Sequence, residues 1–215
     1  MHLRVNEIFA SINGEIAYPR QGSTAVFIRL QGCNLRCKYC DTPKGLETKA
    51  GEKWTIKEVL DKVAELGVRN VTVTGGEPLL QKEEVLTLVT KLHNRGHRIN
   101  VETNGSCRIP SLPPSTSVHW IADYKLPSSG EFGSFHRENK ALLSKKDVLK
   151  FVISDRNDYA YAVSFLEDTY FPSYPIFAFS PAMPEMDPKE LASWMVADKL
   201  DITFSLQIHK VIGAR

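Results

Sequence analysis

The chain has 215 residues, a net charge of +2, and ordinary hydrophobic (42%) and charged (24%) fractions. This length suits one α/β domain, so we expect a single domain over residues 1–215. The near-neutral charge, without a long Lys or Arg run, gives no support for a nucleic-acid or polybasic membrane surface. Because no apolar stretch approaches the roughly 20 residues of a membrane helix and the N-terminus lacks a secretory signal, we expect a cytoplasmic protein.

Hydrophobic patterning predicts strands that alternate with helices along the chain. Strands are expected over residues 25–30, 70–74, 98–103, 119–124, 148–154, 175–180 and 202–208, and helices over 55–66, 82–94, 157–166 and 188–199. Thr55 and Glu58 have the spacing of a capping box, and Gly67 ends that helix. The alternation implies βαβ units and a parallel sheet. Six or seven strands are too few for an eightfold barrel, so we expect an incomplete, open α/β barrel.

Polar residues fall at or near the C-terminal ends of several predicted strands: 74–77, 102–104, 123–125, Ser180 and 207–209. In parallel α/β architectures, this edge is the rim on which active sites are built. One polar strand end would mean nothing, because every strand leads into a polar loop. Several ends that carry Glu, Asp, Lys and His favour a functional rim. Two Pro/Gly/Ser-rich stretches, 109–117 and 127–133, are expected to be surface loops that could cover it.

Three of the four cysteines, Cys33, Cys37 and Cys40, lie within eight residues directly after a predicted strand. Soft thiolates suit Zn²⁺ or an iron–sulfur cluster. A structural zinc site and an electron-transfer cluster generally use four ligands. Cys107 is the only other cysteine, and it stands alone in the sequence with no nearby His. Three ligands would leave one iron of a cluster open to bind a substrate or cofactor.

The C-x3-C-x2-C spacing, with Tyr39 before the last cysteine, resembles the signature of the radical S-adenosylmethionine (SAM) superfamily. The resemblance implies a [4Fe–4S] cluster on the three cysteines, whose open iron binds SAM and cleaves it to a 5′-deoxyadenosyl radical. Residues 74–78 resemble the superfamily motif that binds the SAM amino group. There, Gly75 and Gly76 would let a ligand approach the backbone, and Glu77 would accept a hydrogen bond from an ammonium group.

Three further side chains are candidates for contact with a substrate or a metal ion: Arg29, Glu102 and Thr42. Arg29 lies inside the apolar run 26–30, where an arginine is rarely buried without an anionic partner. It would face an anionic substrate or pair with a structural carboxylate, for which Glu102 is one candidate. Alternation in 98–104 puts Glu102 on a polar face that suits hydrogen bonding to a heterocycle. The Thr42 hydroxyl could cap a turn or act as a hard oxygen ligand for Mg²⁺.

Seven stretches that run nearly end to end resemble the 7-carboxy-7-deazaguanine synthase family, particularly its clostridial-type branch: 7–15, 27–35, 40–42, 74–80, 102–106, 123–130 and 206–210. The resemblance implies a radical SAM lyase that contracts the ring of 6-carboxy-5,6,7,8-tetrahydropterin to give 7-carboxy-7-deazaguanine and ammonia. This reaction serves queuosine and deazapurine biosynthesis. The resemblance also implies that SAM is recycled, that Mg²⁺ bridges Thr42 and the substrate carboxylate, that the electron donor is flavodoxin- or ferredoxin-like, and that the protein is a homodimer.

The same resemblance assigns residues to the site, with no protein acid or base for the central step. The residues that it assigns to substrate binding are Ile12, Asn13, Gly14, Glu15, Arg29, Thr74, Glu102, His209 and the terminal Arg215. The residues that it assigns to SAM binding are Tyr39, Gly75, Gly76, Glu77, Asp123, Tyr124, Lys125, Ser180, Pro181, Ala182 and Met183. The chain departs from many members at 13–16 and at 123–125, and the second difference is shared with the clostridial-type branch.

Two other interpretations are open. A glycyl-radical-enzyme activase, such as the activator of anaerobic ribonucleotide reductase, shares the cysteine spacing, the Gly-Gly-Glu motif and the small size. An activase must admit a protein loop, however, so a buried Arg29 and the polar face of Glu102 would have little to do. A non-enzymatic iron–sulfur or zinc protein would leave the Gly-Gly-Glu motif and the polar rim unexplained.

Overall fold

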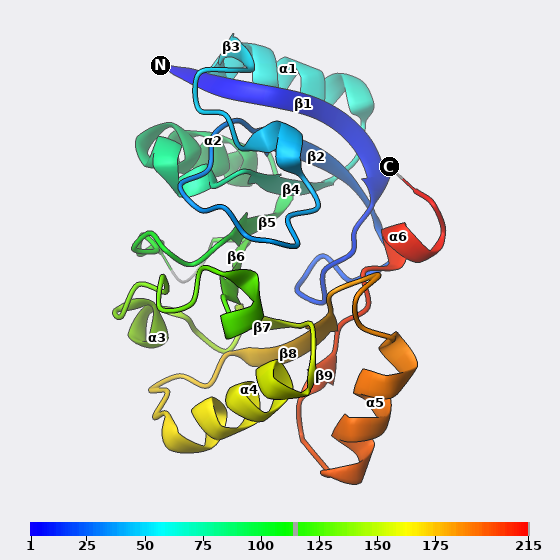
Figure 1. Cartoon of the computed structure of the whole chain (residues 1–215). Helices are drawn as coiled ribbons and strands as arrows, with labels where there is room; N and C mark the ends of the chain where they lie inside the picture. The colour runs from blue at the N-terminus through cyan, green and yellow to red at the C-terminus, as the bar shows by residue number, and fades with distance from the viewer. Residues whose placement is uncertain (114–115, 215) are drawn as a thin grey trace.

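The computed structural model describes residues 1–113 and 116–214, apart from the side chain of His209. Its strands form one nine-stranded sheet in the order β3-β1-β2-β4-β5-β6-β7-β8-β9, curved as an open partial barrel (Figure 1). From β2 to β9 each neighbouring pair is parallel, whereas β1 is antiparallel to both β2 and β3. The expected α/β partial barrel is therefore confirmed.

The strands are β1 (His2–Ile12), β2 (Thr24–Leu30), β3 (Glu52–Thr55), β4 (Asn70–Gly75), β5 (Arg98–Thr103), β6 (Val118–Tyr124), β7 (Val148–Ile153), β8 (Ile176–Pro181) and β9 (Thr203–Phe204). The helices are α1 (Ile56–Leu66), α2 (Lys82–Asn94), α3 (Asn139–Leu142), α4 (Arg156–Asp168), α5 (Pro188–Ala197) and α6 (Ile208–Val211), with 3-10 turns η1 (Pro43–Gly45), η2 (Pro78–Gln81) and η3 (Pro127–Ser129).

The two faces of the sheet have different roles. On β5, Ile99 and Val101 belong to the main hydrophobic core, which the larger helices cover from outside. Their neighbours Asn100 and Glu102 point to the inner face, as strand alternation requires. A second, small apolar cluster, built on Ala17, Ile121, Val148 and Ala178, fills part of the inner face. The inner face is therefore apolar at the N-terminal ends of β6 and β7 and polar toward their C-terminal ends.

The strands predicted up to residue 180 and all four predicted helices agree with the structure, within a few residues at each end. Two strands, β1 and β3, were not expected. A register shift between Val5 and Glu7 breaks the alternation of β1, and β3 is a short edge strand of polar residues. The strand expected over 202–208 is wrong in its second half, because β9 ends at Phe204 and α6 follows.

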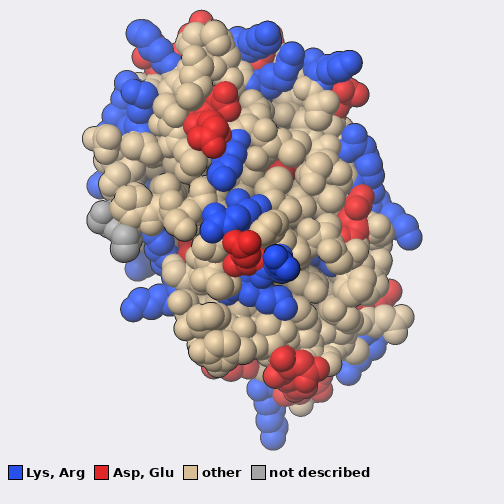
Figure 2. Space-filling view, turned by 90° about the vertical axis from the view of Figure 1, so that its left-hand side faces the viewer, with Lys and Arg blue, Asp and Glu red and all other residues tan. Residues whose placement is uncertain are grey.

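No helix in the described part of the chain is long and apolar enough to cross a membrane. Over the face seen in Figure 2, Lys and Arg side chains are interspersed with Asp and Glu. This mixed surface agrees with the small net charge of +2.

Candidate active site

A cavity of about 450 Å³ opens at the C-terminal ends of the parallel strands. Its walls combine the inner face of β1 and β2, the cysteine loop after β2, and the ends of β4, β5, β6 and β7. The volume lies in the range of small-molecule binding sites. From the polar strand ends expected to form a rim, residues 74–76, 102–104, Asp123, Lys125 and Gln207 contribute to this wall, whereas Ser180 does not.

The three clustered cysteines line the cavity together. Cys33 is buried, Cys37 and Cys40 are half-buried, and all three are free thiols. Among the described residues, no three His, Cys, Asp or Glu side chains converge as ligands of a single metal ion. A cubane cluster does not require that convergence, because each thiolate binds a different iron atom. Three thiols that share one cavity therefore fit a [4Fe–4S] cluster with an open iron.

The Gly-Gly-Glu turn packs against the backbone that leads into the cysteine loop. Gly76 N donates to Leu30 O over 3.1 Å, and Glu77 N donates to Gly32 O over 2.7 Å. A Cβ atom on Gly75 would overlap the Leu30 carbonyl, and one on Gly76 would overlap the Gly32 carbonyl. Both glycines are thus required by the packing of two backbones, and both also line the cavity.

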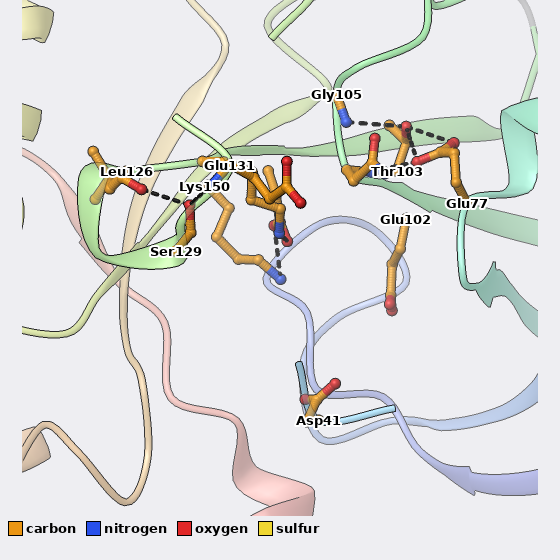
Figure 3. Close-up of polar contacts among 12 residues, drawn as sticks. Asp41, Glu77, Glu102, Thr103, Gly105, Leu126, Ser129, Glu131 and Lys150 are labelled. Atoms are coloured by element: carbon orange, nitrogen blue, oxygen red, sulfur yellow. Dashed lines mark hydrogen bonds and ion pairs between the residues drawn. The ribbon is translucent and has the colours of Figure 1, made fainter. Parts of the chain in front are cut away.

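Glu77 itself points away from the cavity. Its side chain is fully buried, and its carboxylate accepts hydrogen bonds from Leu79 N (2.8 Å), Thr103 Oγ1 (2.9 and 3.0 Å) and Asn104 N (2.6 Å), as Figure 3 shows in part. Burial raises its pKa to about 7, although these hydrogen bonds and Lys125 act to lower it. The carboxylate thus fixes the neighbouring strand end, and the expectation that it accepts a hydrogen bond from a ligand ammonium stays a prediction.

Arg29, on the inner face of β2, faces the cavity and has a carboxylate partner at the same time. Its Nε lies 3.0 Å from Glu7 Oε1 in β1, and its Nη1 donates to Thr42 Oγ1 over 3.2 Å. The structural partner is therefore Glu7 and not Glu102. Lys44 Nζ lies 2.7 Å from the same Glu7 oxygen. Two cations around one carboxylate leave a net positive charge here that fits an anionic group of a ligand.

Lys150 is the main site residue that the sequence analysis missed. It lies on the inner face of β7, where its Nζ is 2.8 Å from Glu15 Oε1 and 3.3 Å from Asp123 Oδ1. Asp123 Oδ2 also pairs with Lys125 Nζ at 2.9 Å. Although burial acts in the opposite direction, these partners raise the pKa of both lysines and lower the pKa of Asp123. The sequence does contain a signal for Lys150, because a charged residue lies there inside the apolar run 148–153. A charged residue inside an apolar run is also the pattern that identified Arg29.

Glu102 extends from β5 into the space that Lys150 also approaches (Figure 3). Its Oε2 accepts a hydrogen bond from Thr74 Oγ1 over 2.8 Å. Burial and the nearby Glu15 raise its pKa to about 7, whereas Lys150 acts to lower it. Glu15 Oε2 is buried and has no hydrogen-bond partner among the described residues. Two carboxylates thus offer acceptor atoms at the cavity, where a ligand with N–H donors would satisfy them.

Most site residues expected from the sequence line this cavity. They are Gly14, Glu15, Arg29, Cys33, Cys37, Tyr39, Cys40, Thr42, Thr74, Gly75, Gly76, Glu102, Asp123, Lys125, Ala182 and Met183. The lining residues that were not singled out as site residues are Glu7, Phe9, Phe27, Leu35, Asp41, Lys44, Leu46, Thr103, Asn104, Lys150, Val152, Gln207 and Lys210. Many of these are apolar or lie on β1, whose strand was not expected, so no local signal marked them.

Other expected residues lie outside the lining. Besides Glu77, these are Ile12, Asn13, Tyr124, Ser180 and Pro181. The Tyr124 ring packs on the outer face against Phe135, Phe151 and Phe165, because the alternation that turns Asp123 inward turns Tyr124 outward. His209 lies in α6, but its side chain is outside the described structure, as is Arg215.

Asn13 has an indirect role in shaping the cavity. Its buried Nδ2 donates to Glu15 O over 3.0 Å and to Pro19 O over 2.8 Å, which holds the loop that carries Glu15. Nearby, Gln21 Nε2 donates to Gly14 O over 2.6 Å and to Leu206 O over 2.8 Å. This amide connects the loop to the C-terminal segment.

Comparison with known proteins agrees with this site. Residues 27–110, which include the cysteine loop and the Gly-Gly-Glu turn, match the family model of the radical SAM superfamily. Together with the partial barrel and the three thiols at its rim, this match defines a radical SAM enzyme. The chain is also 37% identical to the 7-carboxy-7-deazaguanine synthase of Koribacter versatilis, over 98% of this chain and 96% of that protein. The chain belongs to the 7-carboxy-7-deazaguanine synthase family.

A second relative and a solved structure also resemble this chain. The chain is 38% identical to the 7-carboxy-7-deazaguanine synthase of Clostridium acetobutylicum, over 99% of this chain and 96% of that protein. The crystal structure of QueE from Escherichia coli superposes with a TM-score of 0.78 at 21% identity, covering 96% of this chain and 94% of that one, which shows that the fold is shared. These matches give the activase interpretation no support.

Proposed function

We propose that this chain converts 6-carboxy-5,6,7,8-tetrahydropterin to 7-carboxy-7-deazaguanine with loss of ammonia, the reaction that its family membership implies. One observation supports it most directly. A single cavity brings together three free thiols, a cationic group at Arg29, and two carboxylates, Glu15 and Glu102. A carboxylated pterin needs a cation for its carboxylate and acceptors for its ring N–H groups, and this cavity offers both.

In this proposal Arg29 binds the substrate carboxylate, while Glu15 and Glu102 accept hydrogen bonds from the N–H groups of the pterin ring. Thr74 keeps Glu102 in position through its 2.8 Å hydrogen bond. His209 and Arg215 would complete substrate binding. When bound, the cluster and SAM supply the hydrogen-atom abstraction that starts the reaction. Because the overall change removes only ammonia, it involves no net oxidation, and SAM would be recycled.

In this proposal SAM binds to other residues of the same cavity lining. Gly75 and Gly76 allow close approach to the backbone, and the segment from Ala182 to Met183 faces the same cavity. Asp123, held between Lys125 and Lys150, is kept ionised by both lysines, as its lowered pKa indicates. An ionised carboxylate at this position suits the hydroxyl or ammonium donors of SAM.

We also propose that Mg²⁺ binds at Thr42. The Thr42 hydroxyl donates to Asp41 Oδ1 over 3.1 Å, so two oxygen atoms of the kind that Mg²⁺ prefers lie side by side. Arg29 donates to the same hydroxyl, which places the carboxylate-binding cation next to this site. Thr42 and Asp41 would hold the ion, which would supply positive charge for the substrate carboxylate.

Three further parts of the proposal rest on family resemblance. The chain would act as one radical SAM domain over residues 1–215, form a homodimer, and receive electrons from a flavodoxin- or ferredoxin-like donor. Size-exclusion chromatography with light scattering tests the dimer, because a monomeric mass at all concentrations contradicts it.

The central experiment is anaerobic reconstitution with iron and sulfide, followed by incubation with reductant, SAM, Mg²⁺ and 6-carboxy-5,6,7,8-tetrahydropterin. Mass spectrometry should detect 7-carboxy-7-deazaguanine, and product should exceed consumed SAM when SAM is recycled. Release of 5′-deoxyadenosine without any deazaguanine product would show that the cluster is active on a different substrate.

A further inference from the structure

Asn104 connects the cysteine loop to the end of β5, and its side chain contacts a cysteine of the motif. The residue is 8% exposed and lines the cavity. Its amide Nδ2 lies 3.6 Å from Cys33 Sγ and 3.1 Å from Asn34 Oδ1. The two hydrogen atoms of one amide group can therefore serve both acceptors, the thiol sulfur and the Asn34 carbonyl oxygen.

The orientation of this amide is determined by its surroundings. Asn104 Oδ1 accepts hydrogen bonds from Ser106 N (2.9 Å) and Ser106 Oγ (2.7 Å). Ser106 Oγ in turn accepts from Asn34 Nδ2 over 2.8 Å, which closes a ring of three side chains. A flipped amide would place its NH2 group against the Ser106 backbone N–H, and two donors cannot bond each other. The NH2 group must therefore face Cys33.

The backbone of Asn104 is held as firmly as its side chain. Its N–H donates to Glu77 Oε2 over 2.6 Å, and Thr103 Oγ1 donates to both oxygens of the same buried carboxylate. The glutamate of the Gly-Gly-Glu turn thus fixes the strand end from which Asn104 reaches the cysteine loop.

Cys33 differs in this respect from the other two cysteines of the motif. Its sulfur also accepts a hydrogen bond from Leu35 N over 3.5 Å, so two N–H groups point at one thiol. Within the described residues, Cys37 and Cys40 show no such contact at sulfur. Hydrogen bonds to the ligand sulfurs are among the factors that set the reduction potential of an iron–sulfur cluster.

We propose that Asn104 is a positioning residue that raises the reduction potential of the cluster by donating an N–H hydrogen bond to the Cys33 sulfur. The inference rests on the proposed function, because it requires a cluster on Cys33. Adding one electron increases the negative charge on the sulfurs, so an N–H donor stabilises the reduced cluster more than the oxidised one. Asn104 therefore makes the cluster easier to reduce for a biological one-electron donor.

The test is a redox titration of the reconstituted holoenzyme in the absence of substrate. The EPR signal of the reduced cluster is measured at each potential. Asn104→Ala should keep its iron and sulfide content but be about tenfold harder to reduce, a shift of about 59 mV to more negative potential for one electron. Asn104→Asp, which keeps the volume and the contacts to Ser106 but has no N–H donor, should shift further in the same direction. This second variant gives the readout if the alanine variant does not fold.

Asn100→Ala is the matched control, because Asn100 is the same buried residue type within β5 and lies about 13 Å from Asn104, which directly follows that strand. Its potential should equal that of the wild type. An unchanged potential in both Asn104 variants, or an equal shift in the control, overturns the inference while leaving the proposed function intact. A wild-type protein that assembles no cluster overturns both.

Discussion

Lys150 and Glu15 are 135 residues apart in the sequence, yet they form a buried ion pair in the cavity wall with 2.8 Å between Nζ and Oε1. Both side chains are less than 10% exposed. This contact joins the inner face of β7 to the loop between β1 and β2, which is the loop that the proposed substrate must touch.

Replacing one partner of this pair should be costly for folding. Lys150→Met leaves Glu15 as a buried carboxylate without its strongest partner, and such losses amount to about 3–5 kcal/mol. Urea unfolding of the apoprotein measures the loss. The double variant Glu15→Gln, Lys150→Met should lose less than the sum of the two single variants. Strictly additive losses would mean that the two side chains do not interact energetically.

Glu102 should make stability depend on pH. Its pKa is raised from an ordinary 4.5 to about 7, so between these values the folded chain binds a proton more tightly than the unfolded chain does. The stabilisation is therefore complete below pH 4.5 and is lost as pH rises toward 7. Relative to Glu102→Gln, the wild type should lose about 1–3 kcal/mol of unfolding free energy over this window. Urea unfolding at several pH values compares the two, and parallel pH profiles would contradict the raised pKa.

Arg29→Ala should weaken substrate binding and spare SAM cleavage in the absence of substrate. Hydrogen bonds to charged groups contribute about 1.5–3 kcal/mol, so we expect a rise of roughly 10- to 100-fold in KM for the pterin. Arg137→Ala, an exposed arginine, serves as the control and should match the wild type. If uncoupled SAM cleavage falls as much as turnover does, Arg29 acts on the cluster or on folding and not on the substrate.

The sequence predicted the elements whose signals are local. Helix α1 begins at the Thr55–Glu58 capping box and ends at Gly67, which adopts φ 67°, as its position suggested. Strand β1 could not be predicted in the same way, since its bulge between Val5 and Glu7 shifts the apolar pattern from one face to the other. That bulge matters for the site, because Glu7 is the partner of Arg29.

The site was predictable where a motif or an unusual residue marked it. The three thiols, Arg29 and Glu102 carry such signals. The direction of Glu77 does not follow from its motif, because it depends on donors from Thr103 and Asn104 on the next strand. Pairing across long sequence separations, as for Lys150 and Glu15, likewise appears only once the sheet is formed.

Cluster content should separate the motif cysteines from the remaining one. Cys37→Ser should abolish iron and sulfide binding after anaerobic reconstitution, because it removes one of three ligands. Cys107→Ser should retain both, since Cys107 is half-buried beside Ser106 and does not line the cavity. Equal loss of iron in the two variants would indicate four cysteine ligands, and the open iron required for SAM would then be absent.

Removing Mg²⁺ should affect the wild type and Thr42→Ser alike, but not Thr42→Val. The serine variant keeps a hydroxyl beside Asp41, whereas valine has a similar shape and offers no oxygen ligand. Addition of Mg²⁺ to metal-free enzyme should therefore increase product formation in the first two proteins and leave the valine variant at its low basal rate. Because Arg29 also donates to this hydroxyl, Thr42→Val has a second route to lower activity. The response to added Mg²⁺, and not the absolute rate, is the diagnostic quantity, and an equal response in all three proteins would place the ion elsewhere.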